Sequence, residues 1–523
     1  MKKYKKYNLF LVAGLSFLLS FCTLDYDPTG MYSDVTEGAE EGLRFLTRLD
    51  VVAHRQLMYN ALKECEHFYQ DVLLFAEIRT DNAYSGNEGG APPFFERNAV
   101  NNMMTMPPLQ RGWNRRMNNI ALANMLISSI DDTPDPTLTS EERRQFKAEA
   151  MIYRAMLYYD MVLLWGRVPI VIIDAGDITA ANIADVYQHI FPKQNTEDEV
   201  YEQIIKDLLE ALPDAPVNNN DKTLCSLGLA YALLAKIYAD NTPLRDYDKV
   251  IQYCDLVRDL GFSLVEDFSD LFGVLLQDPT SPPGATNPAI NQKRRNTEEA
   301  ILEIHFTAAG DRGSFNNLIF GPVLNNFQPV TFANWVLPTH ELIALYESES
   351  GDKRYPETIV YYGGTQLGFT PPRNWGFSTD HYPHMYKFRS AFNSNIKYRY
   401  ADILLLKAEA LILKQTPDLA AAAEIINQIR RRAGLSNLPA AATATRDAAL
   451  ETMLRERRLE LAFEGHRWND LVRLEKVEEV INAFKDRDPY ARIDIPFTRV
   501  HYKFPIQSTV LDANDQLTQN PGY

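Results

Sequence analysis

The chain has 523 residues, of which 53 are basic and 69 acidic, so its formal net charge is −16. Nucleic-acid-binding proteins need basic patches that release counterions from phosphates, and no stretch of this sequence combines a basic stripe with interleaved aromatic residues. Composition therefore excludes nucleic acid as a partner, and the length allows a large core with several lobes.

The N-terminal segment has the pattern of an export signal. Four lysines lie within the first six residues, an apolar run covers residues 9–21, and Cys22 follows directly. The run is shorter than the roughly 20 residues that span a bilayer, and no later stretch is apolar over that length. Residues 1–21 are therefore predicted to be a signal peptide, whose removal changes the net charge from −16 to −20 because it takes away four lysines and no acid.

The cysteine after the apolar run predicts lipoprotein processing. In that reaction the thiol of Cys22 is acylated and becomes the new N-terminus, and lipid chains then hold the protein at a membrane surface. Residues 22–40 are expected to form a tether. Ordinary secretion is the alternative, because the residue before an acylated cysteine is small and Phe21 is not.

Helical periodicity marks the first half of the chain. Apolar residues recur at three- and four-residue steps over residues 142–165, and the sequence Gly166-Arg167-Val168-Pro169 ends that helix. The next helix opens with Thr196-Glu197-Asp198-Glu199 and runs to about Leu212. These four residues predict a capping box, in which hydroxyl and carboxylate satisfy free backbone amides.

Later helices are expected to pair as hairpins. Residues 224–240 pair with 247–260, and residues 398–414 pair with 420–433. Units of about 34 residues that bury an apolar face only by stacking on neighbours predict a tetratricopeptide-like solenoid. The predicted fold is mostly α, with about four helix pairs packed against an irregular loop-rich lobe.

Residues 262–397 differ in composition from the helical segments. Gly, Pro, Asn and aromatic residues dominate, and one helix is predicted, after Pro338-Thr339. Loops beyond about 15 residues are uncommon in compact domains unless they bind something or are disordered, and the density of aromatic residues disfavours disorder. We expect a ligand-binding face here. The expected body spans 41–523, with helical repeats mainly over 42–75, 110–260 and 398–475 and the loop-rich lobe mainly over 76–109 and 262–397.

Three further cysteines, Cys65, Cys225 and Cys254, lie within helical patterns. Their odd number and the lack of a C-x-x-C pair argue against a disulfide framework. We expect buried thiols, with a disulfide between Cys225 and Cys254 as the alternative.

The C-terminal helical segment carries a recognisable string over residues 454–471, LRERRLELAFEGHRWNDL. It closely resembles the hallmark helix of the SusD/RagB family of outer-membrane nutrient-binding lipoproteins. Other segments agree with the family in order along the chain: Trp113 with Asn118 and Asn124, Ala148 to Ala155, Gly166 to Pro169, Leu233 to Tyr238, Tyr398 to Leu405, Ile425 to Arg430, and the terminal Gln519 to Tyr523.

The resemblance implies a fold, a location and an activity. Family members are helical, with four tetratricopeptide-like units and a looped lobe. They lie on the cell surface, anchored in the outer membrane through lipid, as a lid on a SusC-type TonB-dependent transporter, and they bind glycans for import without catalysis. Some bind peptides instead. The charged string itself is expected to be structural, because Glu460, Glu464 and Arg467 recur at steps of three or four residues, where ion pairs fix helix packing.

Sugar recognition needs aromatic faces that cover the ring and planar polar groups that match its hydroxyls. Residues 80–90 form a polar stretch in a region where the family contributes binding groups. It supplies Asp81, Asn82 and Asn87 as polar candidates and Tyr84 as a stacking candidate. A solvated turn shaped by glycines is the alternative.

Two aromatic clusters supply further candidates. The first contains Phe327 and Trp335, and Trp335 is the first choice because the family often carries stacking aromatics in this stretch. The second runs from Arg373, Asn374 and Trp375 to Tyr382 and combines guanidinium, amide and indole. Packing in a loop core is the alternative for the tryptophans here, and it is the preferred interpretation for Trp113, Trp165 and Trp468.

Other chemistries have weaker support. His381 and His384 are three positions apart, but Pro383 between them precludes a regular helix interior. No further clear metal ligand stands nearby in the sequence. No nucleophile, zinc-protease or phosphate-loop motif occurs, and no cofactor is expected. The leading hypothesis is a non-catalytic glycan-binding protein. A peptide-binding protein, a surface glycoside hydrolase using a carboxylate pair, and a pure scaffold are the alternatives.

Overall fold

The computed structural model describes residues 43–67, 76–85, 107–173, 187, 191–217, 220–275, 291–306, 323–325, 328–330, 336–363, 375–387, 394–491 and 496–523. The predicted signal peptide, the tether and Cys22 lie outside these residues. Within the described ranges, no helix has the length and apolar character needed to cross a membrane.

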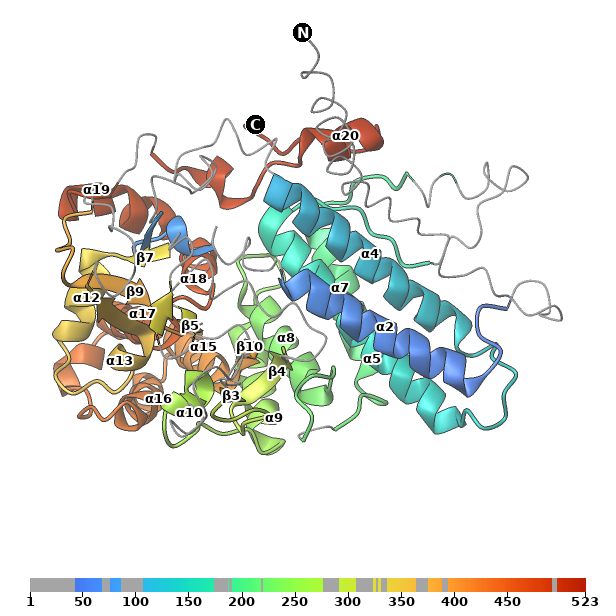
Figure 1. Ribbon diagram of the computed structural model, residues 1–523, viewed down its shortest axis with the longest axis horizontal. Helices are drawn as coiled ribbons and strands as arrows, with labels where there is room; N and C mark the ends of the chain where they lie inside the picture. Colours follow the sequence, from blue (N-terminus) through green and yellow to red (C-terminus); the bar gives the residue numbers. More distant parts are fainter. Residues whose placement is uncertain are drawn as a thin grey trace, which may run out of the picture.

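Four helices form a packed layer in the N-terminal half (Figure 1). Each contacts the next along the chain, and α2, α4 and α5 lie side by side in the blue to teal part of the ribbon. The layer consists of α2 (Arg48–His67), α4 (Pro107–Ser129), α5 (Ser140–Trp165) and α7 (Glu197–Ala211). Helix α5 occupies the interior of this layer, since most of its second half is buried.

Both predicted helix hairpins are confirmed. The first consists of α8 (Leu227–Ala239) and α9 (Tyr247–Asp259), and the second of α15 (Tyr400–Leu413) and α16 (Leu419–Arg432), followed by α17 (Arg446–Leu461). Helix α9 packs against α15, although about 140 residues separate them in sequence. The helical array is therefore continuous, and the intervening lobe is an insertion between two stacked hairpins.

Local sequence signals set several helix ends. Thr139 and Glu142 form a capping box at the start of α5, and the predicted box of Thr196 and Glu199 is confirmed at the start of α7. Gly166 ends α5 with a positive φ of 71°. A Cβ at this position would lie 2.6 Å from a carboxylate oxygen of Glu197, so the turn into the next segment requires glycine.

The inserted lobe is built from short elements. Its described strands form two-stranded antiparallel ladders, β2 with β3, β4 with β10, β5 with β6 and β8 with β9. Strand β1 (Ala83–Ser85), which precedes the lobe in sequence, pairs with β7 (Val336–Pro338) inside it. The other elements are α10 (Ser269–Phe272), β2 (Val274–Leu275), β3 (Asn291–Gln292), β4 (Ala300–Ile304), β5 (Val323–Asn325), β6 (Gln328–Val330), α12 (His340–Glu347), α13 (Tyr355–Thr358), β8 (Ile359–Tyr362), β9 (Tyr382–Met385) and β10 (Asn395–Arg399).

The C-terminal segment returns to the first half of the chain. The amide of Phe504 donates to the carbonyl of Leu164 at 2.7 Å, and the Asn520 side chain donates to the carbonyl of Trp165 at 2.8 Å. Figure 1 shows this red segment lying over the ends of α4 and α5. After α17 the chain forms α18 (Arg467–Arg473), the π-helical turn η4 (Glu478–Asn482), α19 (Phe484–Arg487), η5 (Arg499–Tyr502) and α20 (Ser508–Ala513). The short helix η3 (Ala440–Thr443) precedes α17 and packs against it.

The interior of the helical array contains both described cysteine side chains. Cys225 and Cys254 are buried free thiols, so the alternative of a disulfide between them is wrong. The thiol of Cys254 donates to the carbonyl of Ile403 at 3.4 Å, which joins α9 to α15. Burial raises the pKa of Cys225 to about 12, which keeps this thiol protonated and unreactive. The side chain of Cys65 lies outside the described part of the structure.

Candidate ligand-binding site

A compact group of aromatic side chains lies where β1, β7 and β9 meet. We call it the aromatic cluster, and it consists of Tyr84, Leu337, Trp375, Tyr382 and Phe484, with Phe377 and Tyr490 packed against it. Tyr84 and Trp375 stack with ring centroids 4.7 Å apart and planes 14° apart. These rings are buried, with exposed fractions of 1% for Tyr84, 3% for Trp375 and 0% for Tyr382.

Hydrogen bonds fix the cluster to its surroundings. The hydroxyl of Tyr84 donates to a carboxylate oxygen of Asp488, and it accepts from the amide of His340 at 3.2 Å. The His340 ring donates to the carbonyl of Trp375 at 2.7 Å. The Tyr84 hydroxyl and the Trp375 backbone are thus anchored, which fixes the stacked pair at the centre of the cluster.

Gly376 allows the Tyr490 ring to lie directly against the backbone next to Trp375. Gly376 has a positive φ of 71°, and a Cβ there would lie 2.1 Å from the hydroxyl oxygen of Tyr490. Any larger residue would displace the Tyr490 ring and strain the backbone beside Trp375.

Three chain segments attach to the aromatic cluster. Residues 86–106 follow β1, residues 331–335 precede β7, and residues 364–374 precede Trp375. Ser85 pairs with Val336 across the β1–β7 ladder, and Tyr84 stacks on Trp375, so the attachment points lie together. This convergence is long-range and has no local sequence signal.

Five of the predicted ligand residues belong to segments outside the described residues. Asn87 is two positions after Ser85, Trp335 directly precedes Val336, and Asn374 directly precedes Trp375. The remaining two are Phe327, which lies in the sequence between β5 and β6, and Arg373. Four of these residues lie within two positions of a described residue at the aromatic cluster: Asn87, Trp335, Arg373 and Asn374.

The structure corrects the expected positions of Asp81 and Asn82. Both are 1% exposed and lie in a buried network rather than on an exposed polar loop. Asp81 accepts two hydrogen bonds of 2.9 Å from Arg467, and Asn82 accepts one of 2.8 Å from Arg458. Burial alone would raise the pKa of Asp81, but the guanidinium groups of Arg458 and Arg467 outweigh it and hold the pKa well below its usual value.

The same correction applies to the three described aromatic candidates. Tyr84, Trp375 and Tyr382 were candidates for stacking on a ligand, and their buried rings instead pack against protein side chains. For Trp375 this burial agrees with the alternative of packing in a loop core, whereas the buried Tyr84 does not fit the alternative of a solvated turn. Trp113, Trp165 and Trp468, which the sequence assigned to packing, are also buried.

The charged string of α17 forms buried ion pairs, as expected. Glu460 is the centre, since it accepts hydrogen bonds of 2.5 Å from Arg399, 2.5 Å from Arg432 and 3.3 Å from Arg354. Glu464 pairs with Lys387 at 2.6 Å and with Arg399 at 2.7 Å. These partners come from the inserted lobe and from α16, so α17 joins the lobe to the helical array.

The histidines do not combine into a metal site in the described part of the chain. His384 is buried, and burial lowers its pKa to about 3. The His381 ring stacks instead on Tyr361, with centroids 4.0 Å apart. Among the residues that the structure covers, no group of three or more His, Cys, Asp or Glu side chains is arranged to hold a metal ion.

Sequence reasoning missed the part of the aromatic cluster that comes from the C-terminal region. Phe484, Asp488 and Tyr490 contact residues about 100 to 400 positions away. Their own stretch of sequence has neither a motif nor a period that points to the lobe. A pairing signal between distant positions would have been needed to find them.

Solved structures with this architecture define the class of the protein as a SusD-like helical fold with tetratricopeptide-like repeats. A laminarin-binding SusD-like protein matches with a TM-score of 0.69 and 21% identity, over 92% of this chain and 100% of its own. The surface glycan-binding protein A of Bacteroides thetaiotaomicron, solved with laminarihexaose, matches with a TM-score of 0.70 and 18% identity, over 91% and 99%.

Sequence comparisons place the chain within that class. The SusD family matches residues 299–523, and a family described as starch-binding and associating with the outer membrane matches residues 68–239. The SusD-like protein P38 of Formosa agariphila is 27% identical over the full length of both chains. The chain belongs to the SusD/RagB family.

Proposed function

We propose that this protein is a non-catalytic, lipid-anchored protein of the outer-membrane surface that binds oligosaccharide or polysaccharide and delivers it to a SusC-type TonB-dependent transporter. The observation that carries the proposal is that Ser85, Val336 and Trp375, the described residues that adjoin three segments of the chain, lie together at the aromatic cluster. Those segments contain Trp335, Asn87, Arg373 and Asn374, which have the residue types that sugar recognition uses. The names of two related structures, which bind laminarin and laminarihexaose, support a glycan as the ligand.

The aromatic cluster has a supporting role in this proposal. Its buried rings hold the bases of the three segments in a fixed relation, and the side chains beyond those bases contact the sugar. Such preorganisation matters because a ligand that orders loops on binding loses affinity to the entropy of ordering.

Affinity electrophoresis against a panel of neutral and acidic glycans tests the capture step. We expect at least one glycan to retard the wild-type protein and Trp335→Ala and Asn374→Ala to abolish most of that retardation. Tyr187→Ala is the matched control, because Tyr187 is a 45% exposed aromatic residue remote in sequence from the three segments. If no glycan retards the wild type, or if Trp335→Ala is retarded as strongly as Tyr187→Ala, the proposal fails.

Anchoring and delivery need separate tests. Metabolic labelling with a fatty-acid probe should mark the wild-type protein and not Cys22→Ala. Co-purification from outer membranes should recover a TonB-dependent transporter. Release of reducing sugar from any retained glycan would instead indicate a glycoside hydrolase, and retardation that short peptides alone compete away would indicate a peptide-binding protein.

A further inference from the structure

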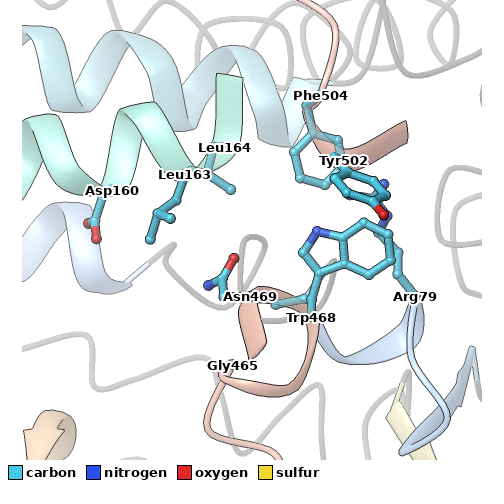
Figure 2. Close-up of a pocket in the computed structure, with 10 residues that line it drawn as sticks. Arg79, Asp160, Leu163, Leu164, Gly465, Trp468, Asn469, Tyr502 and Phe504 are labelled. Atoms are coloured by element: carbon cyan, nitrogen blue, oxygen red, sulfur yellow. The ribbon is translucent and has the colours of Figure 1, made fainter. Parts of the chain in front are cut away.

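A hollow separate from the aromatic cluster lies between the end of α5, α18 and the C-terminal segment. Its cavity volume is about 40 Å³, and it opens to the surface at a mouth. Figure 2 shows Asp160 and Leu163 on one side of the hollow and the rings of Trp468 and Tyr502 on the other. We call it the Arg79 pocket. Its lining includes Arg79, Asp160, Leu163, Trp468, Asn469 and Phe504.

Arg79 is the unusual residue of this lining. It is 1% exposed, yet across the described residues its Nε and Nη1 atoms have no hydrogen-bond acceptor. Its Nη2 donates to the carbonyl of His501. Buried guanidinium groups elsewhere in this protein, such as Arg399 and Arg457, each pair with carboxylates. A buried cation with free N–H groups is costly and calls for an acceptor.

Aromatic rings cover the guanidinium without satisfying it. The Cζ atom of Arg79 lies 3.8 Å from the ring centroid of Trp468 and 4.5 Å from that of Phe504. Such contacts stabilise the positive charge through the ring faces, whereas the N–H groups lie in the guanidinium plane and need an in-plane acceptor. Burial lowers the pKa of Arg79 to about 10, which leaves the group cationic at neutral pH.

The charges around the pocket favour an anion with a single charge. The one carboxylate in the lining, Asp160, is already paired with Lys397 at 2.9 Å and Arg116 at 3.4 Å. Near the rim, the hydroxyl of Tyr502 donates to Glu478. Arg79 therefore retains an unmatched positive charge, while the carboxylate of Glu478 near the rim disfavours a multiply charged anion such as phosphate.

We propose that the Arg79 pocket binds the carboxylate group of a small ligand. The carboxylate accepts from the free N–H groups of Arg79, and the body of the ligand occupies the space between Leu163 and Trp468. A planar monoanion matches a guanidinium better than a compact polyanion does. The enclosed part of the pocket has room for a carboxylate group, and the rest of the ligand lies at the open mouth, so the carboxylate belongs either to a uronic acid or to a free small acid.

Isothermal titration of the mature protein with acetate, glucuronate and galacturonate tests the site, with glucose and the methyl ester of glucuronate as neutral controls. We expect saturable binding of at least one acid and at least tenfold weaker binding of the ester. Binding of acetate and uronates alike identifies a free-acid site, and binding of uronates alone identifies recognition of an acidic sugar. If no acid binds, or if the ester binds as tightly as the acid, the proposal is overturned.

Variants assign the binding to Arg79. Arg79→Gln should abolish it, whereas Arg144→Gln should not, because Arg144 is an exposed arginine whose replacement removes the same charge elsewhere. Asn469→Trp provides a test that leaves Arg79 intact, since Asn469 is only partly buried and a large side chain there fills the hollow. Unchanged acid binding in folded Asn469→Trp or in Arg79→Gln would overturn the assignment.

This site does not depend on glycan capture by the three segments at the aromatic cluster. The titration uses monosaccharide acids and no variant of Trp335 or Asn374. Loss of glycan retardation with intact acid binding, or the reverse, therefore separates the two proposals.

Discussion

At the scale of single residues, Glu460 is the centre of the buried ion pairs that join α17 to its neighbours. It is fully buried and receives three guanidinium groups, two of them through one oxygen. Burial alone would raise its pKa, but the charges of Arg432 and Arg399 outweigh this effect and hold the pKa well below its usual value. The carboxylate is therefore charged throughout the physiological range, and the arginines depend on it.

We expect Glu460→Gln to destabilise the protein by about 3–5 kcal/mol, because it keeps the shape of the side chain and leaves buried cations without their anion. Urea unfolding monitored by circular dichroism measures the change. Glu479→Gln is the matched control, since Glu479 is 68% exposed and its pair with Lys476 contributes about 0–1 kcal/mol. A loss below about 1 kcal/mol in Glu460→Gln would show that the neighbouring carboxylates compensate.

Gly376 allows a second prediction at the residue scale. Gly376→Ala combines a positive φ with overlap of the new Cβ and the Tyr490 ring, whereas Gly351→Ala has φ of 86° and no atom within 4 Å of the new Cβ. We expect a loss of about 1–2 kcal/mol for Gly351→Ala from backbone strain alone. Gly376→Ala should lose more and should also weaken glycan retardation, because Trp375 and the adjoining segment shift. Equal losses for the two variants, with retardation unchanged, would mean that Tyr490 moves away freely.

At the scale of elements, the lobe and the helical array meet through α12, α16 and α17. Glu349, just after α12, pairs with Arg430 of α16 at 3.1 Å and also with Arg455 of α17. Burial alone would raise the pKa of Glu349, but hydrogen bonds and charges from Arg430 and Arg455 lower it from 4.5 to about 2. The folded state therefore binds this proton less readily than the unfolded state.

A pH dependence follows from that shift. A lowered carboxylate pKa stabilises the folded state above about pH 4.5, and the contribution disappears as the pH falls through about 2. We expect Glu349→Gln to cost about 1–3 kcal/mol at pH 7 and progressively less at lower pH. Guanidinium unfolding of both proteins at several pH values measures the difference. Glu347→Gln, two positions earlier and exposed, should differ little from the wild type at any pH. A cost for Glu349→Gln that stays constant down to pH 2 would contradict the ion-pair explanation.

Helix caps and helix hairpins could be predicted from local sequence, whereas the pairing of distant strands could not. The capping box at Thr196 and the hairpins of α8 with α9 and α15 with α16 were predictable, because periodicity and caps act within a few residues. The pairing of Ser85 with Val336 was not, because about 250 residues separate them and each strand has three residues. Strands of three residues show too little alternation of apolar and polar side chains for the sequence to identify the partner strand.

Asp81 illustrates the same limit at the candidate site. Thr80-Asp81-Asn82 has the composition of a polar turn, which made a ligand contact the natural prediction. Its partners, Arg458 and Arg467, follow almost 400 residues later. The spacing of charges on α17 correctly indicated buried ion pairs, but nothing in it identified Asp81 as a partner.

At the scale of the whole molecule, the C-terminal segment closes the structure onto its first half. Asn520 is buried and donates two hydrogen bonds of 2.8 Å, one to the carbonyl of Trp165 and one to that of Phe504. Arg167 adds a bond of 2.7 Å to the carbonyl of Gln519. The Arg79 pocket lies between these two parts of the chain, since Leu163 and Leu164 line it from α5 and Phe504 lines it from the C-terminal segment.

We therefore expect Asn520→Ala to act on stability and on the pocket together. It removes two buried hydrogen bonds, which costs about 1–3 kcal/mol, and it loosens the segment that carries Tyr502 and Phe504. Thermal unfolding should detect the first effect, and weaker acid binding in the titration should detect the second. Gln516→Ala is the control, because Gln516 is exposed and its side chain donates to the neighbouring Asp515 at the surface. If Asn520→Ala lowers stability but leaves acid binding unchanged, the walls of the pocket are held by α18 and α5 rather than by the C-terminal segment.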